Sequence, residues 1–371
     1  CIVHSNGGVL LKHLVEMGLH SNARINSKVF YFTTCGWMMW NWLVSGLLLK
    51  STIYLFDGSP FFPNAEILWD YVDQEKINFM GISAKYIDAL SKENVNIINK
   101  YNLSDLEIIG STGSPLIHES FDYIYKCVKT DVLVASLSGG TDIVGCFIGG
   151  NPMSVVRRGE IQGSILGMDV HVYNEKGEPI KNEKGELVCT QTFPTMPLFF
   201  WNDEKNEKYH NAYFNKYPNV WCHGDYIAKT ENDGFIIFGR SDATLNPGGV
   251  RIGTAEIYRQ VEQIEEVLEG LVVGQIWQGD TRVILFVRLN SNSDLTEVLI
   301  NKIKNKIKMG ASPRHVPAKI ILVNDIPRTK SGKIAELAVR DLIHNKKINN
   351  QTALANPECL EEYKDIKELS V

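Results

Sequence analysis

The chain has 371 residues, of which 44% are hydrophobic and 22% are charged, and its formal net charge at pH 7 is −5. This length and apolar content suffice for a sizeable buried core and favour two or more domains. The acidic balance excludes a general nucleic-acid binder, because affinity for a phosphate backbone requires a basic field.

The cysteines and the longest apolar stretch exclude two further classes. The seven cysteines are an odd, scattered set with no CxxC pair, which predicts neither a disulfide framework nor a zinc site and fits a reducing cytoplasm. Residues 37–49 are apolar but are interrupted by Asn41, Ser45 and Gly46, and the stretch is too short to cross a bilayer. We therefore expect a cytoplasmic protein with no membrane partner, and we interpret residues 37–49 as a buried helix.

The first part of the chain, residues 1–150, alternates short apolar runs with helical stretches. This alternation is typical of βα units, so we expect an α/β fold with a mainly parallel sheet. The expected strands are residues 28–32, 52–56, 77–81, 106–110 and 132–137.

The sequence pattern then changes twice, near residue 151 and near residue 242. Over residues 151–241, turn dipeptides are dense between alternating segments such as 169–173 and 235–239, which predicts a β-rich part. Over residues 242–347 the pattern is that of a compact α+β domain, in which residues 282–289 alternate as a strand does.

Residues 294–309 predict an amphipathic helix. Leu295, Leu299, Ile303 and Ile307 share one face, and Asp294 and Glu297 are spaced as in a capping box. The lysines near its carboxyl end suit the helix dipole, and we interpret them as a solvated face rather than a phosphate site.

The most informative residues lie in two stretches, 239–257 and 326–334. Arg251 offers a planar fork for phosphate or carboxylate, and Lys333 lies in a tight Ser-Gly turn. The stretches resemble the hinge motif and the catalytic-lysine motif of the adenylate-forming superfamily, which contains acyl-CoA synthetases, luciferases and peptide-synthetase adenylation domains. The alternative is a chance arrangement of turns and surface lysines.

This resemblance implies the adenylate-forming enzyme fold. It implies an incomplete large AMP-binding domain over residues 1–241, with an α/β part and a β-rich part. A small mobile α+β domain over residues 242–347 would come next, with Asp242 as the hinge, and residues 348–371 would form a polar tail.

Three further segments, 110–116, 136–145 and 221–225, resemble nucleotide-binding motifs of the superfamily. The first comes directly after an expected strand, and open α/β sheets bind ligands at the carboxyl ends of their strands. The implied nucleotide-binding residues are Gly113, Ser114 and Pro115 at the adenine, Thr141 at the α-phosphate, Asp225 at the ribose with Arg240 assisting, and Arg251 at a phosphate.

The resemblance makes Asp142 the Mg²⁺ ligand, and Lys333, Thr141 and Asp142 the catalytic residues. Most members carry Glu at the position of Asp142, so the carboxylate has a shorter arm in this chain. Mg²⁺ usually takes one or two carboxylates together with phosphate oxygens and water, so one carboxylate is chemically sufficient.

A narrower resemblance, to the acetoacetyl-CoA synthetases, covers nearly the whole chain. It is carried by residues 33–61, 136–147, 311–320, 331–341 and 353–358. Acetyl-specific relatives have Trp at the position of Gly139, and a Trp side chain buries about 150 to 250 Å². The resemblance therefore implies that Gly139 leaves room for a four-carbon 3-oxo acid, with Trp37, Met38 and Thr112 lining the acyl pocket.

The implied enzyme is an acid–thiol ligase whose partners are the small molecules acetoacetate, ATP and coenzyme A. Acetoacetate would attack the α-phosphorus of ATP and release pyrophosphate, with Lys333 and Mg²⁺ offsetting the growing negative charge. The small domain would then turn about Asp242, and Gly248 and Gly249 would form part of the tunnel in which the CoA thiolate attacks the acyl carbon, releasing AMP.

Other interpretations stay open. No Ser/Thr/Gly-rich phosphate loop ending in Lys occurs in the chain, and residues 1–14 resemble the segment directly after that loop, so we expect the chain alone to be impaired. It is alternatively a ligase for acetate, propionate or butyrate, or a non-catalytic remnant that lacks the phosphate loop. A metal site or a hydrolytic pair at His223, with Cys222 beside it and Asp225 nearby, is disfavoured, because no further partner has suitable spacing.

Overall fold

The structure is a computed structural model that describes residues 1–330, 332–348 and 351–370. The chain divides into two compact units. The first consists of Cys1–His223 and Ile227–Ile236, and the second of Gly224–Tyr226 and Ile237–Val371. The boundary thus falls after Ile236, slightly before the expected one, and a short piece of an earlier strand belongs to the second unit.

The first unit contains a five-stranded parallel sheet with the order β3-β2-β4-β5-β6. This confirms the α/β prediction, and each strand lies close to its expected position. The strands are β2 (Lys28–Tyr31), β3 (Thr52–Tyr54), β4 (Phe79–Ser83), β5 (Ile108–Thr112) and β6 (Leu133–Ser136).

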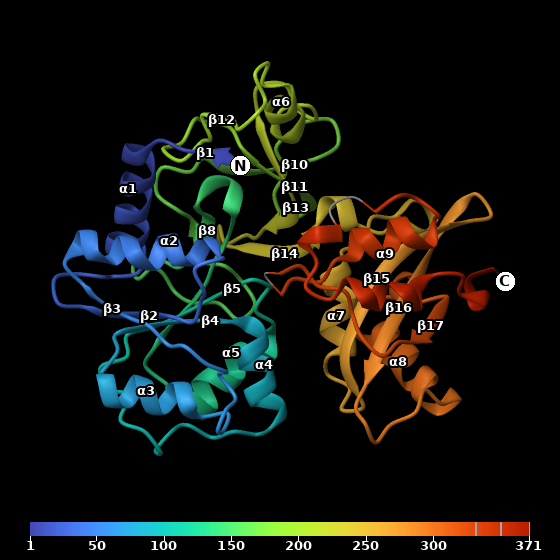
Figure 1. The fold of residues 1–371 in the computed structure, drawn as a ribbon, viewed down its shortest axis with the longest axis horizontal. Coiled ribbons are helices and arrows are strands. Elements are labelled where there is room, and N and C mark those ends of the chain that lie inside the picture. The colour runs from blue at the N-terminus through green and yellow to red at the C-terminus, as the bar shows by residue number, and fades with distance from the viewer. Residues whose placement is uncertain (331, 349–350, 371) are drawn as a thin grey trace. The chain divides into compact units, whose positions relative to one another are not determined.

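Helices cover both faces of this sheet (Figure 1). Phe30 and Met80 pack into a core with α3 (Ile67–Glu75), α4 (Ala84–Lys92) and α5 (His118–Tyr123). The neighbouring strand residues Tyr31 and Phe79 instead contact Trp42 of α2 (Met38–Val44), at ring-centroid distances of 6.0 and 5.4 Å. Successive side chains of a strand point to opposite faces, so both faces of this sheet are apolar.

The apolar stretch 37–49 is only partly a buried helix. Met39, Trp42 and Leu43 of α2 are buried, but the chain then tightens into a 3-10 helix, Ser45–Leu49. In that turn Leu47 and Leu48 are 56% and 48% exposed. Among the described residues, no helix has the length and apolar character that crossing a membrane would require.

The β-rich part contributes strands to small sheets with the orders β10-β11-β13-β14, β7-β8-β9 and β1-β12, the last two of which also take strands from residues 1–150. We expected strands only, but helix α6 (Glu207–Tyr213) also lies here. The strands are β1 (Ile2–Val3), β7 (Ser138–Gly140), β8 (Gly145–Gly149), β9 (Gly163–Ser164), β10 (Val170–Tyr173), β11 (Lys184–Cys189), β12 (Phe199–Phe200), β13 (Trp221–Lys229) and β14 (Phe235–Arg240). Helix α1 (Asn6–Leu14) begins at Ser5, whose hydroxyl accepts a hydrogen bond from Gly8 N.

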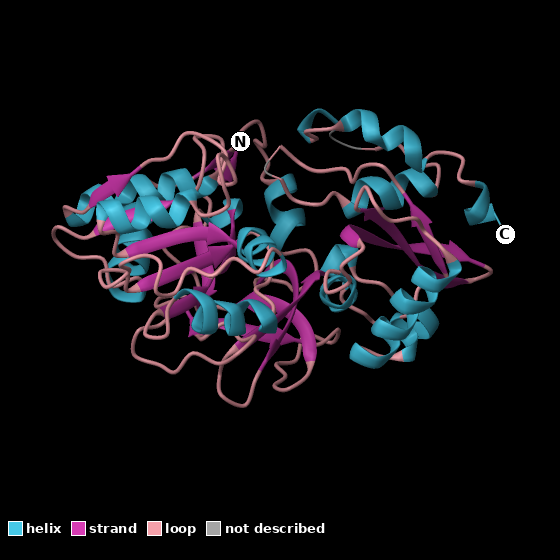
Figure 2. Ribbon diagram, turned by 90° about the horizontal axis from the view of Figure 1, so that it is seen from below, coloured by secondary structure: helices cyan, strands magenta, loops and turns pink. Residues whose placement is uncertain are grey.

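The second unit is built on the sheet β15-β16-β17, which has helices on both faces (Figure 2). Leu285 of β16 packs toward α7 and α8, whereas Phe286 packs toward α9 and the carboxyl end. This period-2 pattern is the one that predicted a strand over residues 282–289. The elements are α7 (Thr254–Val261), β15 (Val267–Trp277), β16 (Asp280–Leu289), α8 (Glu297–Gly310), β17 (Lys319–Leu322) and α9 (Glu336–Ile343).

Two predictions for this unit need correction. Helix α8 begins after Thr296, whose hydroxyl accepts a hydrogen bond from Leu299 N, so the predicted capping box of Asp294 and Glu297 is wrong. The expected polar tail forms short 3-10 helices that carry buried apolar side chains. Tyr363, 1% exposed, packs against the Phe286 ring at 4.9 Å and donates its hydroxyl proton to Asp325 O.

Candidate functional site

The predicted site residues fall into two groups, one in each unit. In the first unit they lie after the carboxyl ends of strands of the parallel sheet, the edge where open α/β sheets bind ligands. Trp37 and Met38 begin α2, after β2, and Gly113 to Pro115 come after β5. Thr112 ends β5, and its hydroxyl donates a hydrogen bond to Leu137 O at 2.8 Å, linking this turn to the chain after β6.

Thr141 and Asp142 lie in a short 3-10 turn between β7 and β8. The turn ends at Val144, which has a φ of 47°, an unfavourable conformation for a β-branched residue. The His13 ring Nε2 lies 2.6 Å from Val144 O, so the imidazole donates a proton that holds this strained carbonyl in place. Burial lowers the pKa of His13 below its ordinary value.

A buried ion pair supports the start of β8. Lys12 Nζ lies 3.2 Å from Glu16 Oε1, and these side chains are 1% and 3% exposed. Both also bond the backbone of Cys146: Lys12 donates to its carbonyl at 2.7 Å, and Glu16 accepts from its amide at 2.8 Å. Trp42 donates to the second Glu16 oxygen at 2.9 Å. Buried charges require such pairing, and here the pair anchors the hairpin that carries Thr141 and Asp142.

Asp142 is held by a residue that the sequence analysis did not find. The Tyr213 hydroxyl, at the end of α6, donates a hydrogen bond to Asp142 Oδ1. The Tyr213 ring stacks on Trp221, with centroids 3.7 Å apart and planes 13° apart. No motif around residues 207–213 indicated this contact, because the two residues are 71 positions apart in the chain.

The fit of this turn to Mg²⁺ depends on the same contact. The Tyr213 bond occupies Oδ1, and Oδ2 of Asp142 lies on the side of Gly140. Among the described residues, no group of three or more His, Cys, Asp or Glu side chains could hold a metal ion. Asp142 therefore fits a Mg²⁺ that takes its other ligands from a phosphate and water, and does not fit a metal held by protein side chains alone.

Gly139 lies where two backbones meet. A Cβ atom at this position would be 1.9 Å from Gly145 O and 2.5 Å from Cys146 Cα on the facing strand. The close approach of β7 and β8 gives a reason for glycine that is separate from the acyl pocket. The role of Gly139 in admitting a larger acyl group stays a prediction.

In the second unit, Arg240 joins two predicted residues. Its Nη1 lies 3.2 Å from Asp225 Oδ1, and its Nε lies 3.5 Å from Asp242 Oδ1. Asp225 is only 8% exposed, so the arginine offsets a largely buried carboxylate. Arg251 lies over the Tyr226 ring, with its guanidinium carbon 4.8 Å from the ring centroid.

The glycines predicted for the CoA tunnel lie in a short 3-10 helix, Pro247–Gly249. Gly248 has a φ of 58°, and its amide donates to both carboxylate oxygens of Asp280 at 3.0 Å. The carboxylate thus fixes the positive-φ turn within this unit, and the tunnel itself stays a prediction.

Lys333 is exposed. The turn that carries it is closed by two bonds: Thr329 N donates to Lys333 O at 2.8 Å, and Lys333 N donates to Thr329 Oγ1 at 3.2 Å. Gly332 in this turn has a φ of 79°, and Ser331 of the predicted Ser-Gly turn lies outside the described residues.

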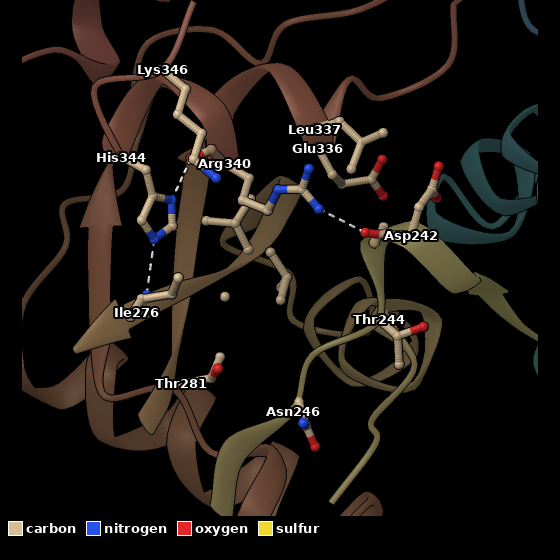
Figure 3. A pocket seen from close by; sticks show the side chains of 14 residues that line it. Asp242, Thr244, Asn246, Ile276, Thr281, Glu336, Leu337, Arg340, His344 and Lys346 are labelled. Carbon is tan, nitrogen blue, oxygen red and sulfur yellow. Dashed lines mark hydrogen bonds between the residues drawn. The ribbon is translucent and has the colours of Figure 1, made fainter. Parts of the chain in front are cut away.

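A pocket of about 350 Å³ lies beside the expected hinge (Figure 3). Arg340 of α9 donates a hydrogen bond from Nη1 to Asp242 O at 2.8 Å. His344 lies between Arg340 O, at 2.6 Å, and Ile276 N, at 2.9 Å, and thereby ties the end of α9 to β15. No sequence motif indicated this arrangement, because its residues come from separate elements.

Solved structures identify the class of this fold. An acetoacetyl-CoA synthetase from Streptomyces lividans superposes with a TM-score of 0.94 at 39% identity, covering 100% of this chain and 57% of that one. An anthranilate CoA ligase shares the fold with a TM-score of 0.76 at 19% identity. The chain thus has the adenylate-forming enzyme fold with an incomplete large domain, as predicted. No protein-family model matches it.

Curated relatives narrow the identification. The chain is 58% identical over 369 residues to an acetoacetyl-coenzyme A synthetase of Rhizobium meliloti and 46% identical over 371 residues to one of Gallus gallus. Over its whole length it is a homologue of the acetoacetyl-CoA synthetases, which confirms the resemblance inferred from its motifs. It spans 57% and 56% of the length of these two relatives.

Proposed function

We propose that this chain supplies the residues for activating acetoacetate with ATP, through an acyl-adenylate, to acetoacetyl-CoA. The observation that carries the proposal is the 58% identity, over the whole chain, to a relative named for this activity. The chain spans 57% of the length of that relative. We therefore propose the complete reaction for this chain joined to a segment that corresponds to the rest of the relative.

The charged groups support the proposed chemistry. Lys333 is an exposed cation on a closed turn, suited to meeting a negative charge that develops on a transferring phosphoryl group. Asp225 and Arg240 form a bonded pair that would accept and donate toward ribose hydroxyls. Thr141 would contact the α-phosphate, and Gly113, Ser114 and Pro115 would form the adenine turn.

Mg²⁺ and the CoA step belong to the same proposal. Bound at Asp142, Mg²⁺ would polarise phosphate oxygens. The acyl pocket would be lined by Trp37, Met38, Thr112 and Gly139. Arg251 would bind a phosphate of the nucleotide or of CoA. The tunnel for the CoA thiol would be lined by Gly248 and Gly249. Asp242 would act as the hinge between the two partial reactions. We also propose a cytoplasmic location.

The experiment separates the two partial reactions. The chain is assayed alone and joined to the part of the Rhizobium meliloti relative that lies outside the match; we call the latter the completed protein. In the completed protein, Lys333→Ala is expected to abolish thioester formation from free acetoacetate but to preserve it from pre-made acetoacetyl-adenylate. Lys330→Ala removes a neighbouring exposed cation and should change neither rate. Equal losses in both assays for Lys333→Ala would contradict its assigned role.

A substrate comparison tests the acyl group. ATP–pyrophosphate exchange by the completed protein is measured with acetoacetate, acetate, propionate, butyrate and 3-hydroxybutyrate. The proposal expects the largest kcat/KM with acetoacetate. A preference for another acid would favour the alternative ligase, and no exchange with any acid would favour the non-catalytic alternative.

A further inference from the structure

We infer that Tyr213 is a positioning residue for the candidate Mg²⁺ site, setting the orientation of the Asp142 carboxylate so that one oxygen stays available to a metal. The inference rests on the proposed function. It concerns a residue outside every motif that the sequence analysis singled out.

Aromatic packing fixes Tyr213. Its ring is stacked on Trp221 and is met by Phe200 at 5.8 Å and Tyr209 at 5.5 Å, both at steep interplanar angles. Tyr213 is 5% exposed and Trp221 1%. With neighbours on its face and edges, the ring cannot turn away, so its hydroxyl has a fixed position.

The helix that carries Tyr213 is itself anchored. The buried carboxylate of Asp203 accepts hydrogen bonds from Lys208 N at 3.2 Å and Tyr209 N at 2.9 Å, in the first turn of α6. Unpaired amides at a helix start need such acceptors, so Asp203 fixes where α6 begins. The position of Tyr213, one turn later, is set by this start.

The carboxylate is positioned from the other side by a different set of contacts. The turn that contains Asp142 connects β7 to β8. Hydrogen bonds from His13 to Val144 O, and between the Lys12–Glu16 pair and the backbone of Cys146, position this turn. The hydrogen bond from Tyr213 to Asp142 therefore joins two elements that are positioned independently. A tyrosine hydroxyl buried in this way needs a partner, and a carboxylate is a strong one.

This contact bears on the short reach of the Asp142 side chain. A shorter side chain has less reach toward a ligand, so its direction matters more. By engaging Oδ1, the phenol selects one orientation and leaves Oδ2 as the oxygen for a cation. Groups that orient a metal ligand in this way commonly change metal affinity by about 10- to 100-fold when they are removed.

The test measures Mg²⁺ dependence in the completed protein carrying Tyr213→Phe. Two readouts are used: calorimetric affinity for ATP as a function of Mg²⁺ concentration, and the Mg²⁺ concentration that half-saturates pyrophosphate exchange. We expect the half-saturating Mg²⁺ concentration to rise about tenfold. We expect kcat at saturating Mg²⁺ to change much less, because the hydroxyl acts through the metal ligand.

The matched control is Tyr209→Phe, which removes a hydroxyl from the same helix one turn earlier and should leave the Mg²⁺ dependence unchanged. In an Asp142→Asn background, Tyr213→Phe should add no further loss, because the oxygen that it orients is gone. Unaltered Mg²⁺ dependence in Tyr213→Phe, or an equal effect of Tyr209→Phe, would overturn the inference alone. If the unmutated completed protein showed no Mg²⁺-dependent ATP binding, the proposed function and this inference would fall together.

Discussion

Arg340 donates a hydrogen bond to the backbone carbonyl of Asp242, with 2.8 Å between the two atoms (Figure 3). The side chain of Asp242 meets a second arginine, Arg240, at 3.5 Å. The residue proposed as the hinge is thus held at its backbone and at its carboxylate. A change in its φ and ψ would have to break the Arg340 bond, beside a pocket that leaves room for movement.

The first prediction concerns this bond. Arg340→Gln should raise amide hydrogen exchange over residues 241–245 by about 10- to 100-fold. A hydrogen bond to a charged donor contributes about 1.5 to 3 kcal/mol, and 1.4 kcal/mol corresponds to a factor of ten. In the completed protein, the rates of adenylation and thioester formation should change in opposite directions. The substitution removes the Arg340–Asp242 bond, which stabilises the present conformation of the hinge and not the conformation reached after the hinge turns. Lys346→Ala, which removes another cation from the pocket, is the control. Parallel changes in both partial reactions would argue against a hinge role.

The second prediction concerns Gly139. Gly139→Ala should destabilise the chain by about 1 to 3 kcal/mol, because the added methyl group would meet the Gly145 carbonyl and force β7 and β8 apart. Chemical denaturation followed by tryptophan fluorescence measures the effect. Gly163→Ala lies in the same sheet, and its Cβ would meet no atom within 4 Å, so this control should cost much less. Equal stabilities for the two variants would refute the close-approach explanation.

The third prediction is a pH dependence of stability. Burial lowers the pKa of His13 below its ordinary value of 6.5 in the folded chain. Below pH 6.5 the unfolded chain therefore binds a proton at His13 that the folded chain does not bind. The free energy of unfolding should consequently fall as the pH drops through 6.5 toward the lower folded pKa, by at most about 1.4 kcal/mol per pH unit from this group.

The measurement is urea denaturation at several pH values from 7.5 to about 5. His13→Gln keeps a side-chain amide that can donate to Val144 O and should flatten the curve in this window. His210→Gln removes an exposed histidine of α6 and serves as the comparison. An unchanged pH profile in His13→Gln would show that this imidazole is not the group responsible.

Parts of the fold could be predicted from local pattern. The prediction of a strand over residues 282–289 placed β16 correctly. Its two faces are both buried, and the residues from Val283 to Val287 form a continuous apolar run, which is typical of such a strand. The start of α8 was misplaced, because Asp294 and Thr296 are both good capping residues and only the backbone path decides between them. Residues 357–370 looked polar, but a few apolar side chains there, Tyr363 and Leu369 among them, are enough to pack the segment onto the sheet.

The candidate site divides in the same way. Lys333, Asp225 and Arg240 could be predicted as site residues from short motifs, because each lies among a few neighbouring residues whose pattern is recognisable in the sequence. Tyr213 and Arg340 could not, because each acts through a residue that is distant along the chain. Lys12 and Glu16 were missed for a related reason: a lysine and a glutamate four residues apart look like a solvated helix pair, and only burial shows otherwise.

The sequence by itself determined the order of strands and helices, the relationship to the acetoacetyl-CoA synthetases and the chemical types present in the motifs, because these depend on residues close together along the chain. Only the tertiary structure decided which oxygen of Asp142 is already bonded, which arginine holds Asp242 and which atoms a side chain at position 139 would meet. Those properties depend on distances between segments that folding brings together, and hydrogen bonds and steric clashes act only over a few ångströms.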